Sequence, residues 1–256
     1  ASILVCGLIM FGIAYAFINM NRALASAGTS YSWVSMVFGR ALGFFAGWAL
    51  LVLCCVFMVS AMIPAANATL LIFDRPMMNN VHYVTLIAAA WLTFVSVVVV
   101  KGIKLTSYVQ VVMTLIEGVI LLGIIVASFM VFPRTPQHPF SWVWFWPFAF
   151  TPKLFANGAL VAIFFFYGWD VTMNLSEETR DANRTPGRAA FWSMVFLMVF
   201  FLVFIVITQL ALSDAEIQHY NTNIIFAIAE KLFGPTWGYV AIVAVLLSTV
   251  GTVETQ

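Results

Sequence analysis

Two carboxylates, Asp170 and Glu117, stand inside stretches of the chain that are otherwise apolar. If these stretches cross a membrane, an acidic side chain near the middle of each one costs about 2.5–3.5 kcal/mol on insertion scales. A carboxylate in that position is expected to face the protein interior and to bind a substrate, an ion or a proton. The two carboxylates are therefore the first candidates for chemistry.

Asp170 follows Gly168 in the sequence FFFYGWDVTMNLSEE, residues 164–178. Glycine costs about 1 kcal/mol in a helix interior, so it marks an expected break in the helix. A break at membrane depth is tolerated where it lines a cavity or is buried in protein, and the freed helix N-terminus attracts an anionic group. The simpler alternative is that Asp170 caps the second half-helix by accepting a hydrogen bond from the N–H of Thr172 or Met173.

Glu117 ends a series of polar residues, Ser107, Gln110, Thr114 and Glu117, in an apolar segment. Their separations of three, four and three residues place all of them on one face of a helix. This stripe predicts a coupling site at Glu117, with Gln110 and Thr114 beside it, which takes up and releases a proton or an ion. The alternative is a neutral or paired carboxyl that holds two helices together.

These residues can act within a membrane only if the segments that carry them cross it, and the composition of the chain indicates that they do. The chain is 63% hydrophobic and 8% charged, whereas an ordinary soluble domain has about 25% charged residues. The apolar segments are long enough to cross a bilayer and too evenly apolar for barrel strands, so they are expected to be helices. We predict a single all-α, polytopic transmembrane domain over residues 1–256. The seven predicted spans are 1–20, 42–66, 83–100, 108–132, 157–176, 190–212 and 237–253.

The basic residues predict the orientation of this domain in the lipid bilayer. Seven of the eleven Lys and Arg residues fall in the loops 21–41, 101–107 and 177–189, which are therefore expected in the cytoplasm. The formal net charge of +1 gives no indication of a nucleic-acid partner. Since the sequence starts at Ala1, without Met and inside a span, it is expected to be part of a longer protein.

Several classes of chemistry are excluded by residue type. The three histidines, His82, His138 and His219, lie in loops or at span ends, so they offer no axial ligand for a buried haem and no base for an intramembrane serine protease. The sequence has no zinc-ligand spacing, no phosphate-binding loop, and no Lys in its seventh span for a retinal Schiff base. We therefore expect no enzyme activity, no cofactor and no metal site.

Two further patterns predict packing rather than chemistry. Gly43 and Gly47 form a pair of small residues that lets another helix approach closely. The aromatic segment FSWVWFWPF, residues 140–148, is expected to be an interfacial belt or a short surface helix, because Trp favours that depth.

Four segments of the chain carry a family likeness, and their order makes it specific. They are ALASAGTSYSWVSMVFGRALGFFAGWALLV (23–52), KGIKLTSYVQ (101–110), FFFYGWDVTMNLSEETRDANRTPGRA (164–189) and EKLFGPTWGYVAIVAVLLST (230–249). Together they resemble the amino acid–polyamine–organocation permease superfamily, whose members share the fold of the sodium-coupled leucine transporter. The resemblance implies an inverted-repeat transporter fold, of which the predicted spans are helices two to eight.

The resemblance also implies roles for individual residues. In the family, the unwound part of the sixth helix holds or covers the substrate, and positions on the third helix face it. The residues assigned to the substrate site in this way are Phe166, Tyr167, Gly168 and Trp169 on the sixth helix, with Asp170 beside them, and Cys54 and Met58 on the third. Glu117 matches a position on the fifth helix that carries a lysine in a proton-coupled relative, where that lysine takes the place of a sodium site. The carboxylate of Glu117 departs from that lysine. Because a buried carboxyl group can take up and release a proton, a proton is expected as the coupling ion rather than sodium. The sequence departs from the family at Asp181-Ala182, where Asn-Pro is usual.

We interpret the chain as a secondary active transporter, or permease, that moves an amino acid or a related amine across the cell membrane by alternating access. The substrate and the oligomeric state are left open. The alternatives are a membrane sensor that binds an amino acid without moving it, and a channel. The sensor would bind its ligand without counterflow of labelled substrate, and the channel would conduct without saturation.

Overall fold

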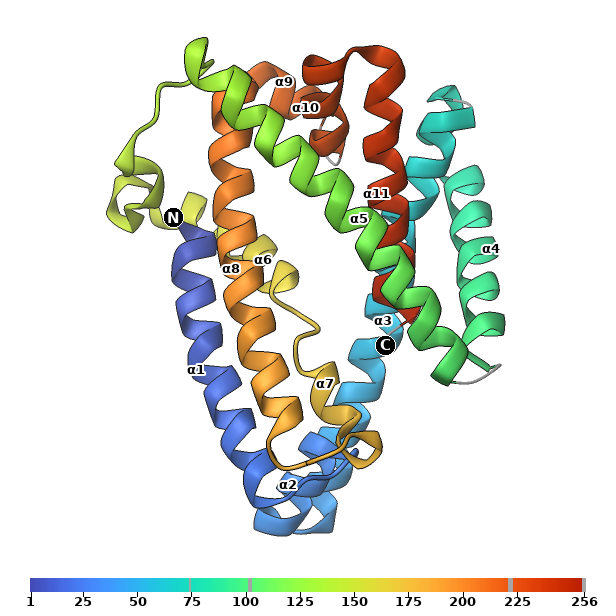
Figure 1. Ribbon diagram of the computed structural model, residues 1–256. Coiled ribbons are helices and arrows are strands. Elements are labelled where there is room, and N and C mark those ends of the chain that lie inside the picture. Colours follow the sequence, from blue (N-terminus) through green and yellow to red (C-terminus); the bar gives the residue numbers. More distant parts are fainter. Residues whose placement is uncertain (74, 101–102, 221–222, 255–256) are drawn as a thin grey trace. The chain divides into compact units, whose positions relative to one another are not determined.

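The computed structural model describes residues 1–73, 75–100, 103–220 and 223–254, and no strand occurs in these segments (Figure 1). The predicted all-α architecture is therefore confirmed. Among the described residues, six helices are long and apolar enough to cross a membrane, namely α1, α3, α4, α5, α8 and α11. The elements in chain order are α1 (Ser2–Ala23), α2 (Thr29–Phe38), α3 (Arg40–Phe73), η1 (Arg75–Asn79), α4 (Val81–Val100), α5 (Ile103–Val131), η2 (Phe132–Arg134), η3 (Trp142–Phe145), η4 (Pro147–Ala149), α6 (Pro152–Phe165), α7 (Val171–Asn174), η5 (Ser176–Glu178), α8 (Thr185–Ala211), α9 (Asp214–Tyr220), α10 (Ile224–Phe233) and α11 (Pro235–Glu254).

The fifth predicted span, 157–176, is an interrupted helix rather than a continuous one. Helix α6 ends at Phe165, and the short helix α7 starts only at Val171. Gly168 lies between them with φ at +103°, a backbone conformation that glycine adopts far more readily than any other residue. The break expected at this glycine is confirmed.

The helices form two compact units, and α3 and α8 contribute to both. Unit 1 consists of Ala1–Leu53 and Ser141–Ile205, and unit 2 of Cys54–Phe140 and Val206–Gln256. The organisation of residues 1–256 as a single transport domain stays a prediction.

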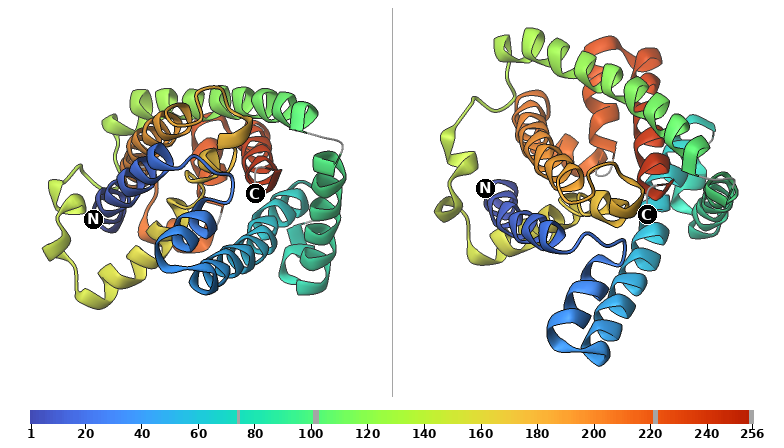
Figure 2. Two further views of the ribbon diagram at one scale, coloured as in Figure 1. Left: turned by 90° about the horizontal axis from the view of Figure 1, so that it is seen from below. Right: turned by 60° about the horizontal axis from the view of Figure 1, so that its bottom comes forward.

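The core of unit 1 forms where α1, α2, α8 and the interrupted segment meet (Figure 2). Gly7 in α1 allows this packing, because a Cβ at that position would lie only 2.8 Å from Cζ of Phe166. The Phe17 ring connects two indoles, with its centroid 5.3 Å from the rings of both Trp33 and Trp169 in edge-to-face arrangements. Aromatic packing therefore fixes the residues on both sides of Gly168.

Helices α2 and α3 form a hairpin in unit 1 with an unusually close approach. A Cβ on Gly43 would lie 2.8 Å from the Cα of Ser35, and a Cβ on Gly47 would lie 3.2 Å from the ring of Tyr31. The predicted small-residue contact at these two glycines is confirmed, and the helix that approaches is α2.

Unit 2 is built around α5, α10 and α11, which pack against one another (Figure 1). One of its cores joins α3, α10 and α11 and consists of Ala68, Leu71, Phe226 and Ile242. Helix α4 is attached to α3 by a hydrogen bond in which Nε1 of Trp91 donates to Oγ1 of Thr69 at 2.9 Å.

Two predicted surface segments are placed as follows. Residues 140–148 form the short 3-10 helices η3 and η4 instead of one α-helix, and Trp142, Trp146 and Phe148 are exposed. In the predicted loop 101–107, residues 101 and 102, including Lys101, lie outside the described residues. The cytoplasmic assignment of the loops stays a prediction.

Candidate functional site

The interruption in unit 1 spans Phe166–Asp170, and local geometry explains why α6 ends there. The N–H of Phe166 still donates to Ala162 O at 3.1 Å, but the next N–H, of Tyr167, donates to Phe164 O at 3.2 Å in a tighter turn. The left-handed Gly168 then turns the chain out of the helix path. The backbone resumes helical geometry only at α7.

The Asp170 carboxylate contacts this interruption. It is half-buried and interacts with the backbone N–H groups of Asp170 itself and of Gly168. The alternative in which it caps α7 through Thr172 or Met173 is wrong, because no side-chain capping bond forms. Asp170 has helical φ and ψ of −74° and −17°, whereas a capping side chain normally needs an extended backbone to reach forward.

The aromatic residues around Gly168 divide into two groups. Phe166 and Trp169 are buried in the core of unit 1. The Phe166 ring also packs edge to face against the ring of Phe201, with 5.6 Å between the two ring centroids. Tyr167 is half-buried. Burial of Phe166 and Trp169 anchors the break to α1 and α8, and their assignment to substrate binding stays a prediction.

In unit 2, polar groups of α5 face α11. The Glu117 carboxylate interacts with the side chain of Ser248 on α11, and both residues are half-buried. One turn further along α11, Gly251 makes room for Gln110, since a Cβ there would lie 2.9 Å from Oε1 of its amide. Thr114, which the spacing places on the same face, is exposed. The spacing of α5 thus indicates this face, but it cannot name Ser248 as the partner.

The two remaining candidates, Cys54 and Met58, lie in the part of α3 that belongs to unit 2, and both are half-buried. The predicted site residues are therefore distributed over both units. Their assembly into one site stays a prediction.

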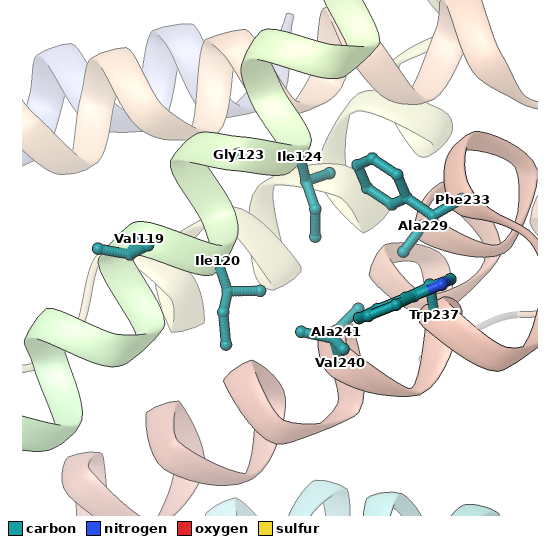
Figure 3. Close-up of a pocket in the computed structure, with 9 residues that line it drawn as sticks. All are labelled: Val119, Ile120, Gly123, Ile124, Ala229, Phe233, Trp237, Val240 and Ala241. Carbon is teal, nitrogen blue, oxygen red and sulfur yellow. The ribbon is translucent and has the colours of Figure 1, made fainter.

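A pocket of about 370 Å³ opens between α5, α10 and α11 in unit 2 (Figure 3). Its walls are apolar side chains and one glycine: Val119, Ile120, Gly123, Ile124, Ala229, Phe233, Trp237, Val240 and Ala241. An amino acid carries two charged ends that need hydrogen-bond partners when they leave water. Apart from the indole N–H of Trp237, the side chains of this wall offer no such partner, so the pocket does not suit that ligand.

The described residues contain no cluster of three or more His, Cys, Asp or Glu side chains arranged to hold a metal ion. The candidate functional features are therefore an interrupted helix with a carboxylate beside it, and a second carboxylate inside a membrane-length helix.

A chain whose described residues form helices without strands, six of them long and apolar enough to cross a membrane, belongs to the class of multi-pass integral membrane proteins. Its sequence matches the family described as "Amino acid permease" over residues 1–255, and the chain belongs to this family. The likeness found in the sequence segments is thereby confirmed, and the protein is an integral protein of the cell membrane.

Similarity to a curated relative points the same way. The chain is 21% identical over 224 residues to "Branched-chain amino acid permease BcaP" of Lactococcus lactis subsp. cremoris (strain MG1363). The matched region covers 78% of this chain and 46% of that protein, so the chain spans about half the length of its relative.

Proposed function

We propose that the protein is a secondary active transporter that carries amino acids or related amines across the membrane by alternating access. The observation that carries the proposal is the interruption at Phe166–Asp170, where a helix stops and restarts beside a half-buried carboxylate. A broken helix provides backbone groups and a helix N-terminus for a substrate that has charged ends. Family membership supports amino acids as the substrate class.

In this proposal the substrate binds at the unwound backbone of Gly168. Tyr167 and Trp169 cover it, and Asp170 favours a ligand with a positive charge, such as the ammonium group of an amino acid. Cys54 and Met58 provide apolar surface. Because the similar protein named above is a branched-chain amino acid permease, L-leucine is the first substrate to test.

The transport activity is tested with the intact protein in proteoliposomes, by counterflow of radiolabelled L-leucine and a panel of other amino acids. A carrier shows saturable counterflow. A sensor shows ligand-induced thermal stabilisation without counterflow, and a channel shows flux that does not saturate. Either of the last two results would replace the transporter assignment.

We further propose that Glu117 couples transport to a proton rather than to sodium. A carboxylate within a membrane-length helix, next to Ser248, can exist in charged and neutral forms as its surroundings change. One coupled proton lets a gradient of one pH unit accumulate the substrate about tenfold, because one pH unit is worth about 1.4 kcal/mol.

Replacing Glu117 with Gln tests this role. The amide can still interact with Ser248 but cannot take up a proton, so the accumulation ratio at a gradient of one pH unit should fall from about 10 to about 1 while counterflow persists. Glu178→Gln, which changes an exposed carboxylate, is the matched control and should accumulate normally. Uptake by the unmodified protein that a protonophore leaves unchanged would refute proton coupling. Normal accumulation by Glu117→Gln would show that Glu117 does not couple transport to a proton.

A further inference from the structure

A fully buried asparagine stands at the end of α1 in unit 1. Asn21 lies in the last turn of this helix and has 0% of its surface exposed. Its Nδ2 donates to the backbone carbonyl of Ala182 at 2.8 Å, and its Oδ1 accepts from the hydroxyl of Ser176, itself 0% exposed, at 2.9 Å. Both ends of the amide are thus used, and a buried polar group is strongly disfavoured once it loses its partner.

The two partners of Asn21 bracket the stretch Ser176–Ala182 that follows the interrupted helix. This stretch ends in a turn at Asp181, which has φ at +56° and whose carbonyl accepts from the N–H groups of Arg184 and Thr185 at 2.9 and 3.0 Å. Asp is one of the few residues other than glycine that adopts this left-handed backbone readily. The turn brings the Ala182 carbonyl to Asn21, where Asp181-Ala182 stands in place of the family's Asn-Pro.

The stretch Ser176–Ala182 also forms hydrogen bonds with the connection between α1 and α2. Oε1 of Glu177 accepts from the N–H of Ala27 at 3.0 Å and from the hydroxyl of Ser26 at 3.5 Å. The same connection is held by Trp33, whose Nε1 donates to the carbonyl of Leu24 at 2.9 Å. Figure 1 shows the end of α1, helix α2 and the stretch after α7 at one end of unit 1.

Helix α7 depends on contacts of this kind for its position. It contains only four residues, Val171–Asn174, and a single helical turn is not stable by itself in the absence of tertiary contacts. The core contacts of Trp169 and Met173 hold α7, and Ser176, whose single hydroxyl proton is shared between Oδ1 of Asn21 and the carbonyl of Met173, holds its end. Asn21 is the residue that connects this end to a long helix.

We propose that Asn21 is a positioning residue for transport: through Ser176 and Ala182 it holds α7 to the end of α1 and so sets the geometry of the interruption at Gly168. The inference rests on the proposed function, because it takes the interruption as the place where the substrate binds. Asn21 does not contact the substrate. It acts through the backbone of the segment that does.

The experiment compares Asn21→Ala with the unmodified protein in proteoliposomes, measuring KM and Vmax of L-leucine counterflow. Loss of both buried hydrogen bonds loosens α7, so KM should rise about tenfold while Vmax per folded protein changes little. A purely structural role would instead lower the amount of folded protein and leave KM unchanged. The matched control is Asn19→Ala on the same helix: Asn19 is exposed, its Nδ2 donates only within α1 to the carbonyl of Tyr15, and its replacement should leave KM unchanged.

Ser176→Ala provides an independent variant if Asn21→Ala does not fold. It removes the hydroxyl that donates to Asn21, and it should raise KM in the same direction. Because the two side chains act through one bond, the double variant should have nearly the KM of Asn21→Ala alone, and fully additive effects would overturn the inference. An unchanged KM in the folded single variants would overturn it too. Absence of counterflow by the unmodified protein would instead refute the transport of L-leucine on which the inference rests.

Discussion

The hairpins α2–α3 and α10–α11 make the same turn but differ in how closely their helices approach and in how they are attached to neighbouring elements. Gly39 ends α2 with φ and ψ of +90° and 167°, and Gly234 ends α10 with +83° and 171°. In each hairpin a second glycine follows four residues later, Gly43 in α3 and Gly238 in α11, and faces the residue four positions before the turn. The same backbone motif therefore occurs once in each unit.

The first hairpin is held by backbone proximity. A Cβ on Gly43 would lie 2.8 Å from the Cα of Ser35, and only the buried Trp33 and Thr29 anchor α2, while Phe38 near the turn is exposed. Helices at this distance gain dispersion contacts along their backbones, but they leave no room for an additional methyl group.

The second hairpin packs less closely, and its first helix is attached to a neighbouring helix. A Cβ on Gly238 would lie 3.2 Å from the Cα of Glu230, which is a looser fit. Polar side chains attach α10 to the preceding helix α9: Glu230 accepts from the hydroxyl of Tyr220 at 3.0 Å, and Lys231 forms an ion pair with Glu216 at 2.7 Å. Glycines thus set the turn in both hairpins, and in the second one polar side chains also attach α10 to α9. The two hairpins should respond differently to added volume and to acid.

The largest difference is expected from a methyl group on the second glycine. In Gly43→Ala the new Cβ meets the backbone of α2, which must shift, and unfolding should become easier by about 3 kcal/mol. In Gly238→Ala the neighbour needs to move by only a few tenths of an ångström, so the expected loss is about 1 kcal/mol. The measurement is the free energy of unfolding in a titration with a denaturing detergent.

Two other helix glycines serve as controls for this comparison. Gly12 in α1 and Gly118 in α5 have no neighbouring atom within 4 Å of an added Cβ. Their replacement by Ala should be neutral or stabilising by up to about 1 kcal/mol, because alanine favours the helix. Equal losses at Gly43 and Gly238 would show that the approach distances do not govern the stability of the hairpins.

The close approach at Gly43 is one of the features that the sequence alone predicts, together with the membrane helices and the break at Gly168. Each of these depends on residues that are neighbours in the chain, such as an apolar run or a glycine between aromatic residues. The pair Ser213 and Glu216 carries a further local signal, since Ser-x-x-Glu is typical of a helix start and these two residues cap α9.

Contacts between segments that are far apart in the sequence cannot be predicted from the sequence in this way. Spacing places Glu117 on one face of α5 but says nothing of Ser248, because residue types along one helix do not identify the helix opposite. Asn21 resembles an ordinary polar residue at a span end, and only the fold brings Ser176 and Ala182 to it. The capping role of Asp170 fails for a related reason, since it depends on backbone angles that its residue type does not determine.

An intermediate and equal effect is expected from the turn glycines. Gly39 and Gly234 have nothing within 4 Å of an added Cβ, so replacing either with Ala introduces backbone strain without a clash. Their φ and ψ lie in a region that is almost exclusive to glycine, and the strain should be about 2 kcal/mol in each hairpin. The same detergent titration measures it. A clearly larger loss in one variant would indicate that its turn is not the shared motif.

The smallest effect is expected from acid, and it should be confined to the second hairpin. The hydrogen bond from Lys231 and that from the N–H of Ser213 lower the pKa of Glu216 to about 2, whereas an unperturbed glutamate has a pKa of about 4.3. A carboxylate with a lowered folded-state pKa contributes stability above its unfolded pKa and loses it as the pH falls toward the folded value. The contribution should therefore decline between about pH 4.3 and pH 2, and it should be small because the ion pair is partly exposed.

Hydrogen exchange, corrected for the intrinsic rate at each pH, measures this in both hairpins at once. Protection of α9 and α10 should decrease as the pH falls through that window, whereas residues 29–53, which contain no carboxylate, should keep their relative protection. In Glu216→Gln the protection of α10 should be lower from the start and should lose most of its dependence on pH, because the amide cannot titrate. A parallel decrease in both hairpins would assign the acid response to a carboxylate elsewhere in the chain, and the two hairpins would then differ in their packing alone.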